Sequence, residues 1–136
     1  MMAGSGDTVL LVEDDDSMRE AIERLLSAAG FGCAAYPSAD ALLARGLDEG
    51  SACLIGDLRL PGMSGLELLA TLRQRGISLP FILITAHDTP ALRQKAMQCG
   101  AAAYLAKPFR GTMLLDAVRA AIQRSRQAPT GNARQV

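Results

Sequence analysis

Five short apolar runs, separated by segments with helical periodicity, are the feature that most limits what this chain can fold into. The runs cover residues 8–12, 32–36, 52–55, 81–85 and 102–106, and each has the length of a strand. Such strict alternation predicts an α/β fold whose parallel strands are covered by helices on each side, with right-handed crossovers. A chain of 136 residues has the length of one domain.

Capping residues and apolar stripes predict the helices between these runs. Each of the first four helices is expected between an N-cap residue and a stop. The expected bounds are Asp16 to Gly30, Ser38 to about Ala44, Ser64 to Gly76 and Thr89 to near Gly100. A last helix is expected around the apolar stripe from Leu114 to Ile122.

Charge and cysteine content narrow the classes of function. Basic and acidic residues number 14 each, so there is neither a basic field for indiscriminate nucleic-acid binding nor an acidic tail. Cys33, Cys53 and Cys99 lack metal-ligand spacing, and we interpret them as reduced small hydrophobic residues, with a reactive thiol as the alternative. With no signal-peptide pattern or membrane-length run, we expect a soluble, cytoplasmic protein without direct membrane or nucleic-acid contact.

Acidic residues follow two of the apolar runs. Glu13 and Asp14 come after the first run, and Asp57 follows the third. Because parallel strands bring their carboxyl ends to one edge of a sheet, we expect these carboxylates to meet there. Mg²⁺ prefers oxygen ligands and keeps several waters, so Asp14 and Asp57 are candidates for direct ligands, with Glu13 holding a metal-bound water.

A basic partner is expected for these carboxylates, since two of them about 4 Å apart repel by roughly 4 kcal/mol at an effective dielectric constant near 20. Lys107 fits, because it follows the fifth run and the fifth strand of a doubly wound sheet can lie beside the third. Thr85 ends the fourth run and would present a hydroxyl to the same edge. These groups permit attack by the Asp57 carboxylate on an activated phosphorus, whose oxygens the metal, Lys107 and Thr85 would stabilise.

Four stretches, in this order, resemble the receiver domain of bacterial two-component response regulators. They are residues 12–15 (VEDD), 57–65 (DLRLPGMSG), 85–87 (TAH) and 104–109 (YLAKPF). The resemblance implies a flavodoxin-like (βα)5 fold with a parallel sheet in the order 2-1-3-4-5. It covers about residues 7–125, which leaves residues 126–136 as a tail or the start of an interdomain linker.

The resemblance implies that Asp57 accepts a phosphoryl group from the phosphohistidine of a sensor histidine kinase. Thr85 and Tyr104 match a pair of switch residues, through which phosphorylation would change the surface of the fourth helix, fifth strand and fifth helix. That surface is also a candidate homodimer interface. Lys107-Pro108 matches a peptide bond that is usually cis in the family. The resemblance implies a Mg²⁺ site made by Glu13, Asp14, Asp57 and the backbone carbonyl of Arg59.

The local sequence around the phosphoacceptor, Thr85 and Lys107 is similar to the FixJ-like transcriptional regulators. In that subgroup a receiver is followed by a linker and a helix-turn-helix output domain, which this chain lacks. The chain would then be a fragment ending in its linker, or a stand-alone receiver that acts by protein–protein interaction or as a phosphate sink. The phosphorylated state is expected to reset by slow self-hydrolysis.

Other functions fit parts of the pattern. A small Mg²⁺-dependent phosphatase would turn over a phosphate ester many times, and a degenerate receiver would act as an interaction module without binding Mg²⁺. The acidic residues lack the spacing of an EF-hand, and Asp57-Leu58-Arg59 lacks the second aspartate of a haloacid-dehalogenase-type phosphatase. Taken singly, the aspartates at 14–16 could be a solvated helix start and Lys107 a surface charge.

Overall fold

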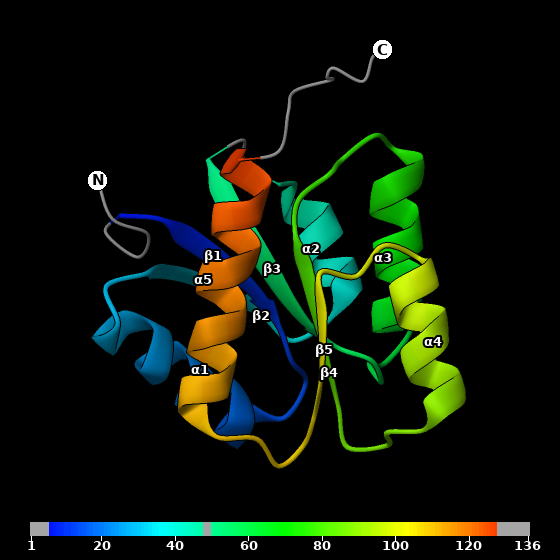
Figure 1. Ribbon diagram of the computed structural model, residues 1–136, viewed down its shortest axis with the longest axis horizontal. Helices are drawn as coiled ribbons and strands as arrows, with labels where there is room; N and C mark the ends of the chain where they lie inside the picture. The colour runs from blue at the N-terminus through cyan, green and yellow to red at the C-terminus, as the bar shows by residue number, and fades with distance from the viewer. Residues whose placement is uncertain (1–5, 48–49, 128–136) are drawn as a thin grey trace.

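Five parallel strands form one sheet in the order β2-β1-β3-β4-β5 (Figure 1). The computed structural model describes residues 6–47 and 50–127. The strands are β1 (Thr8–Val12), β2 (Gly32–Tyr36), β3 (Ser51–Asp57), β4 (Phe81–Thr85) and β5 (Ala103–Ala106). The helices are α1 (Asp16–Ala28), α2 (Ala39–Arg45), α3 (Gly65–Gln74), α4 (Pro90–Gln98) and α5 (Gly111–Gln127). The predicted fold class and strand order are confirmed.

The neighbours of β5 differ from one expectation. The fifth strand does not lie beside the third, because β4 lies between them and pairs with both. The last pair of the β4–β5 ladder is Thr85 with Ala106, and the backbone N–H of Lys107 then donates to the Thr85 carbonyl (2.7 Å). The Lys107 side chain therefore reaches Asp57 from a strand two places away, which its four-carbon stem permits.

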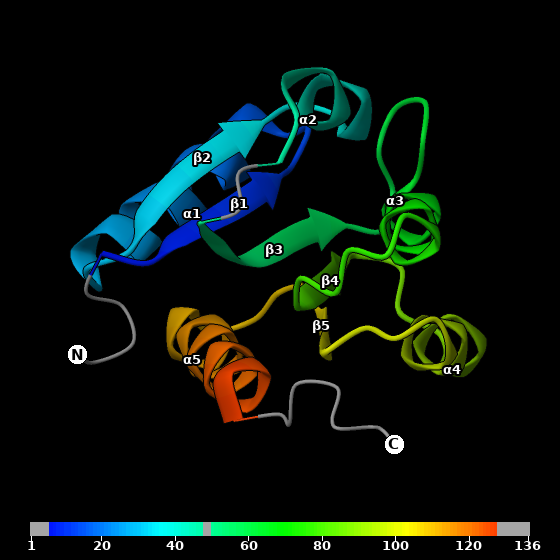
Figure 2. The same cartoon turned by 90° about the horizontal axis from the view of Figure 1, so that it is seen from above.

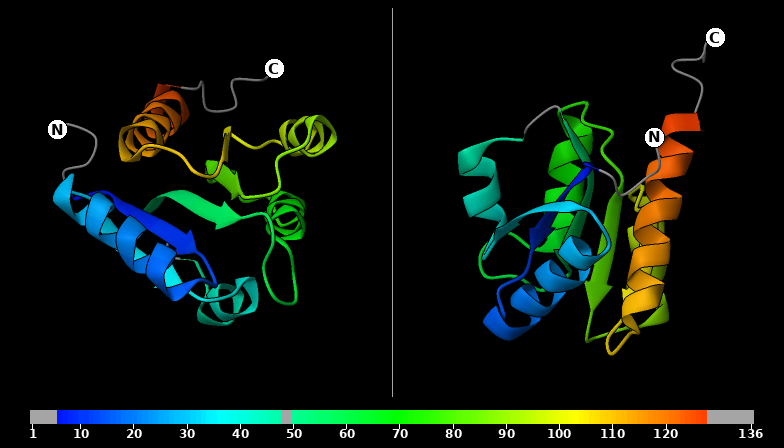
Figure 3. Two further views of the ribbon diagram at one scale, coloured as in Figure 1. Left: turned by 90° about the horizontal axis from the view of Figure 1, so that it is seen from below. Right: turned by 90° about the vertical axis from the view of Figure 1, so that its left-hand side faces the viewer.

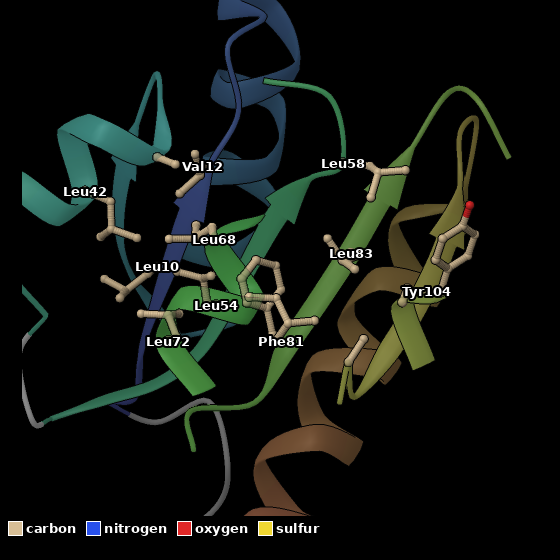
Figure 4. Packing of buried hydrophobic residues seen from close by; sticks show 14 residues of the cluster. Leu10, Val12, Leu42, Leu54, Leu58, Leu68, Leu72, Phe81, Leu83 and Tyr104 are labelled. Atoms are coloured by element: carbon tan, nitrogen blue, oxygen red, sulfur yellow. The ribbon is translucent and has the colours of Figure 1, made fainter. Parts of the chain in front are cut away.

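Helices cover both faces of the sheet (Figure 2). α2, α3 and α4 pack on one face, and α1 and α5 pack on the other. Each face of the sheet has one buried apolar cluster beneath its helices. Within β1, Leu10 and Val12 belong to the first cluster and Val9 and Leu11 to the second, as the period of two in a strand requires. Figure 4 shows the first cluster, with Tyr104 at its β5 side.

The N-cap of α1 is Asp15, so the expectation of Asp16 is wrong by one residue. The Asp15 carboxylate accepts the N–H of Met18 (2.8 Å), while Asp16 is the first helical residue. The reason lies in the preceding loop, where the Glu13 carboxylate accepts the N–H of Asp15 (3.1 Å) and holds this residue outside the helix. The expected N-caps Ser38, Ser64 and Thr89 are confirmed.

Two elements extend further than expected. β3 includes Asp57 as its last residue, where the sequence pattern ended the run at Ile55. α5 continues to Gln127, and residues 128–136 of the predicted tail lie outside the described residues. The guanidinium of Arg126 donates to both carboxylate oxygens of Asp7 (2.6 and 3.2 Å), which fastens the last turn of α5 to the start of β1. The domain limits and the role of residues 126–136 as a linker stay predictions.

The thiols agree with a further expectation. Cys33, Cys53 and Cys99 are free thiols. Burial raises the pKa of Cys33 to about 11 and that of Cys53 to about 12, so both are protonated and unreactive at neutral pH. Among the described residues, no helix combines the length and apolar character needed to cross a membrane.

Candidate functional site

Three carboxylates meet at the carboxyl edge of the sheet. Ligand oxygens of Glu13, Asp14 and Asp57 all lie within 4.8 Å of one another. Glu13 and Asp14 directly follow β1, and Asp57 ends the adjacent β3, so the parallel register brings them together. Glu13 and Asp57 are buried, with 1% and 6% exposure, whereas Asp14 is exposed. The predicted meeting of these side chains is confirmed.

Lys107 neutralises part of this negative charge. Its ammonium group donates to Asp57 Oδ2 (2.6 Å) and to Glu13 Oε1 (3.0 Å). Burial lowers the pKa of Lys107, but its hydrogen bonds to the two carboxylates outweigh burial, so the net pKa is raised. The lysine is therefore charged throughout the neutral range.

Glu13 is the most deeply buried carboxylate of the cluster. Burial raises the pKa of its carboxyl, and the charge of Asp57 acts in the same direction. The N–H of Asp15 and the ammonium of Lys107 oppose this rise by hydrogen-bonding to the carboxylate, yet the net pKa stays above its ordinary value. A cation bound beside Glu13 would favour its charged form.

Asp57 is held at both of its carboxylate oxygens. Oδ1 accepts the backbone N–H of Arg59 (2.9 Å), and Oδ2 accepts Lys107. The chain then turns into α3, whose first residue Gly65 donates its N–H to the Leu58 carbonyl (3.0 Å). The main chain of Arg59 thus borders the cluster, and the use of its carbonyl as a metal ligand stays a prediction.

Thr85 lies at the end of β4, next to the strand that ends at Asp57. It is fully buried, and its hydroxyl oxygen accepts the backbone N–H of His87 (3.0 Å). Its own hydroxyl hydrogen is available for another acceptor. His87 is exposed on the following loop, as expected, and belongs to the rim of the site. The peptide bond between Lys107 and Pro108 is cis, as the resemblance implied.

Tyr104 is buried in β5, in the cluster that also contains Leu83 of β4 (Figure 4). The Arg93 guanidinium of α4 lies 4.7 Å from the centre of its ring and also contacts the Asp88 carboxylate (3.4 Å). Burial raises the pKa of the Tyr104 phenol, and the charge of Asp88 adds to this rise. Motif reasoning selected Tyr104 but missed Arg93.

Arg19 is a second residue that motif reasoning missed. Its guanidinium donates to the backbone carbonyl of Glu13 (2.9 Å) and to the carboxylate of Asp16 (2.6 Å). A contact with a carbonyl can be made with any residue type, so it leaves no motif in the sequence. The helical spacing of Asp16 and Arg19 was the only available signal.

The donor set suits a hard divalent cation. Mg²⁺ favours one or two carboxylates, supplemented by water and phosphate oxygens. The exposed Asp14 carboxylate and the carboxylate of Asp57 could supply direct ligands, and Glu13 could hold a bound water. The three side chains thus form an acidic triad whose oxygens could hold such a cation.

Comparison with known protein families shows to which family the chain belongs. A family model described as the response regulator receiver domain matches residues 9–119. The chain belongs to this family. A receiver domain works as a phosphoacceptor that pairs with a histidine kinase, rather than as an enzyme that turns over a diffusible substrate.

Some curated relatives of this receiver domain are named as transcriptional regulatory proteins. It is 40% identical over 117 residues to the transcriptional regulatory protein FixJ of Azorhizobium caulinodans, covering 86% of this chain and 56% of that protein. It is 41% identical over 119 residues to nodulation protein W of Bradyrhizobium diazoefficiens, covering 88% of this chain and 52% of that protein. The receiver domain therefore spans about half the length of these relatives.

Solved structures give the same family and fold. The structure described as FixJ-N has a TM-score of 0.78 and 35% identity, covering 88% of this chain and 95% of that chain. Full-length FixJ from B. japonicum has a TM-score of 0.81 and 32% identity, covering 90% of this chain and 61% of that chain. These similarities support the FixJ-like subgroup that the local sequence indicated.

Proposed function

We propose that Asp57 of this receiver domain accepts a phosphoryl group from the phosphohistidine of a sensor histidine kinase. The observation that carries the proposal is the Asp57 carboxylate, grouped with Glu13 and Asp14 and bonded to Lys107 at 2.6 Å. A carboxylate oxygen of Asp57 would form a bond to phosphorus while the phosphorus–nitrogen bond of the phosphohistidine breaks. The product is an acyl phosphate, and the histidine leaves as a free imidazole.

The neighbouring side chains have distinct roles in this proposal. Lys107 pairs with a phosphoryl oxygen, since its ammonium already contacts Asp57. Thr85 donates its hydroxyl hydrogen to another phosphoryl oxygen. Glu13, Asp14, Asp57 and the Arg59 carbonyl would hold Mg²⁺, which would supply positive charge that offsets the charge of the phosphoryl oxygens.

Phosphorylation would be passed to the surface formed by α4, β5 and α5. The added charge draws the Thr85 hydroxyl toward the phosphoryl group, and Tyr104 changes position in the space that Thr85 leaves. Both residues lie at the β4–β5 side of the sheet, and the ladder between these strands ends at Thr85 and Ala106. The altered surface would bind an output partner or a second copy of the domain.

The output is proposed to be control of transcription. The named FixJ relatives are transcriptional regulatory proteins, and the receiver domain aligns with about half of their length. An output domain in the same protein, or a separate partner, would supply DNA contact. A stand-alone receiver that binds a partner or acts as a phosphate sink is the alternative. Slow hydrolysis of the acyl phosphate at Asp57 would reset the switch.

Labelling with acetyl phosphate tests the phosphoacceptor assignment. With Mg²⁺, wild-type protein is expected to gain the mass of one phosphoryl group in a base-labile linkage. The Asp57→Asn variant should show no gain, because the amide cannot form an acyl phosphate. Asp116→Asn, an exposed change on α5 with the same effect on net charge, should label like wild type. Equal labelling of wild type and Asp57→Asn, measured by mass spectrometry, would refute the assignment.

A further inference from the structure

Arg19, near the start of α1, bonds to the loop that carries two of the clustered carboxylates. Its Nη2 donates to Asp16 (2.6 Å), an ordinary pair at helical spacing. Its Nη1 donates to the carbonyl oxygen of Glu13 (2.9 Å), which lies before the helix begins. The Arg19 side chain is 19% exposed, whereas that of Asp16 is 82% exposed. Arg19 thus lies against the loop rather than in solvent.

Glu13 is held at four of its polar atoms. Its N–H donates to the Tyr36 carbonyl of β2 (3.0 Å), and its carboxylate oxygens accept Lys107 (3.0 Å) and the N–H of Asp15 (3.1 Å). The fourth atom is the carbonyl oxygen that Arg19 binds. This carbonyl belongs to the planar peptide group that joins Glu13 to Asp14, so Arg19 fixes the orientation of that plane.

The position of the Asp14 carboxylate depends on this peptide plane more than the positions of the Glu13 and Asp57 carboxylates do. Its carboxylate is exposed, and no hydrogen bond or ion pair found in residues 6–47 and 50–127 involves it. No partner among these residues fixes its rotamer, so the backbone sets only the region that this carboxylate can reach. Glu13 and Asp57, by contrast, are each held through their own carboxylate oxygens.

We propose that Arg19 is a positioning residue for Mg²⁺ binding, which it promotes by holding Asp14 in the carboxylate cluster. The inference rests on the proposed function, because it takes the cluster to be the metal site. The positive charge of Arg19 would by itself oppose a cation, but the contact with Asp16 at 2.6 Å offsets that charge. The orienting effect therefore outweighs the repulsion, and removing Arg19 weakens Mg²⁺ binding.

Magnesium titration of metal-free protein, followed by amide NMR shifts around Asp14 and Asp57, tests the inference. Arg19→Gln is expected to weaken Mg²⁺ binding about tenfold, which is typical for loss of a group that orients a metal ligand. Arg24→Gln is the matched control on the same helix. The substitution removes the same charge, and the Arg24 side chain is 82% exposed. The control should bind Mg²⁺ as wild type does.

Arg19→Lys separates the orienting contacts of Arg19 from its charge. It also provides the test if the Arg19→Gln variant does not fold. Lysine keeps the charge but has a single ammonium, which cannot bridge the Glu13 carbonyl and Asp16 in the same way. Its Mg²⁺ affinity should lie between those of wild type and Arg19→Gln. A folded Arg19→Gln or Arg19→Lys protein with wild-type or tighter affinity would overturn the inference alone. No Mg²⁺ response near Asp57 in wild type would instead overturn the proposed metal site.

Discussion

At the scale of single residues, the carboxylate cluster depends on Lys107 for its charge balance. Carboxylates about 5 Å apart repel by about 3 kcal/mol per pair at an effective dielectric constant near 20. The ligand oxygens of the three carboxylates lie within 4.8 Å of one another. The Lys107 ammonium lies 2.6 Å from the Asp57 carboxylate and 3.0 Å from the Glu13 carboxylate. Its attraction therefore offsets their repulsion, and its removal would leave the buried Glu13 without its cation.

The raised pKa values of Lys107 and Glu13 both make stability fall as pH rises, but in two different pH ranges. Because the folded pKa of Lys107 is raised, its stabilisation is fully present below its ordinary value of 10.5 and is lost as pH rises through the folded value. The folded pKa of Glu13 is also raised, so the folded state binds a proton more readily than the unfolded state. Stability is therefore lost as pH rises from 4.5 through the folded pKa of Glu13.

Lys107→Met tests this balance in buffer without divalent metal. At pH 8 we expect a loss of about 2 kcal/mol in the free energy of unfolding, below the value for a fully buried pair because the site is partly open to solvent. At about pH 5 the loss should shrink, since Glu13 can then take up a proton in the folded state. Urea unfolding at both pH values measures the difference. Lys95→Met, an exposed change on α4, is the control, and an equal loss at both pH values would contradict the account.

The residues of the cluster were predictable because each ends or follows a strand. An apolar run precedes each of the polar residues Glu13, Asp14 and Asp57. Parallel strands bring the polar ends of such runs to one edge of the sheet. The partner of the Glu13 carbonyl was not predictable, since a main-chain acceptor is the same for every residue type. The contact of Arg19 with this carbonyl could therefore be found only from the structure.

At the scale of elements, the approach of α3 to the end of β3 depends on Gly65. A Cβ atom at this position would overlap the carbonyl oxygen of Asp57 and lie 3.1 Å from the Cα atom of Leu58. The neighbouring atoms are backbone and cannot rotate away. The capping box of Ser64 and Glu67 begins the helix at this same point, so the start of α3 is fixed from both sides.

Gly65→Ala should therefore separate α3 from β3. We expect a loss of about 3 kcal/mol in the free energy of unfolding, at the upper end for an extra methyl group in a packed site. The displaced Asp57 should also slow labelling by acetyl phosphate. Gly50→Ala is the matched control, because nothing lies within 4 Å of a Cβ atom at that position. Chemical denaturation of both variants measures the effect, and equal stabilities would show that the backbone adjusts.

Strands and helix starts were largely predictable at this scale, whereas exact bounds were not. Ser64 with Glu67 and Thr89 with Pro90 are local signals, and both act as expected. Asp15 and Asp16 are chemically equivalent caps, and the contact of Glu13 with the Asp15 N–H decides between them. Local sequence does not contain that contact, because it depends on how the loop folds over the sheet edge.

At the scale of the whole molecule, Mg²⁺ binding should stabilise the entire domain. A ligand that binds only the folded state at ten times its Kd adds about 1.4 kcal/mol to the free energy of unfolding. For a domain of this length, that corresponds to a rise in Tm of about 5 °C. Asp14→Asn should lose most of this rise, and Asp116→Asn should keep it. Thermal unfolding followed by circular dichroism measures the shifts, and an equal rise in Asp14→Asn would indicate binding elsewhere.

The layered architecture was predictable because five alternating units leave few arrangements that bury both faces of a parallel sheet. The path by which the Lys107 side chain reaches the cluster was less predictable, since β4 lies between β5 and β3 and a direct neighbourhood of these two strands was only one possibility. The pairing of Asp7 with Arg126 was not predictable, because neither residue belongs to a motif and 119 positions separate them.

The ion pair between Asp7 and Arg126 has a geometric consequence for joining this domain to other proteins. It brings both ends of the described chain to the edge of the sheet opposite the carboxylates, as the position of the α5 end in Figures 1 and 3 shows. The seven residues of β3 separate the two edges by roughly 20 Å. A module fused at either end would stand clear of the acidic residues, so attached modules could be exchanged while the reactive edge keeps its shape.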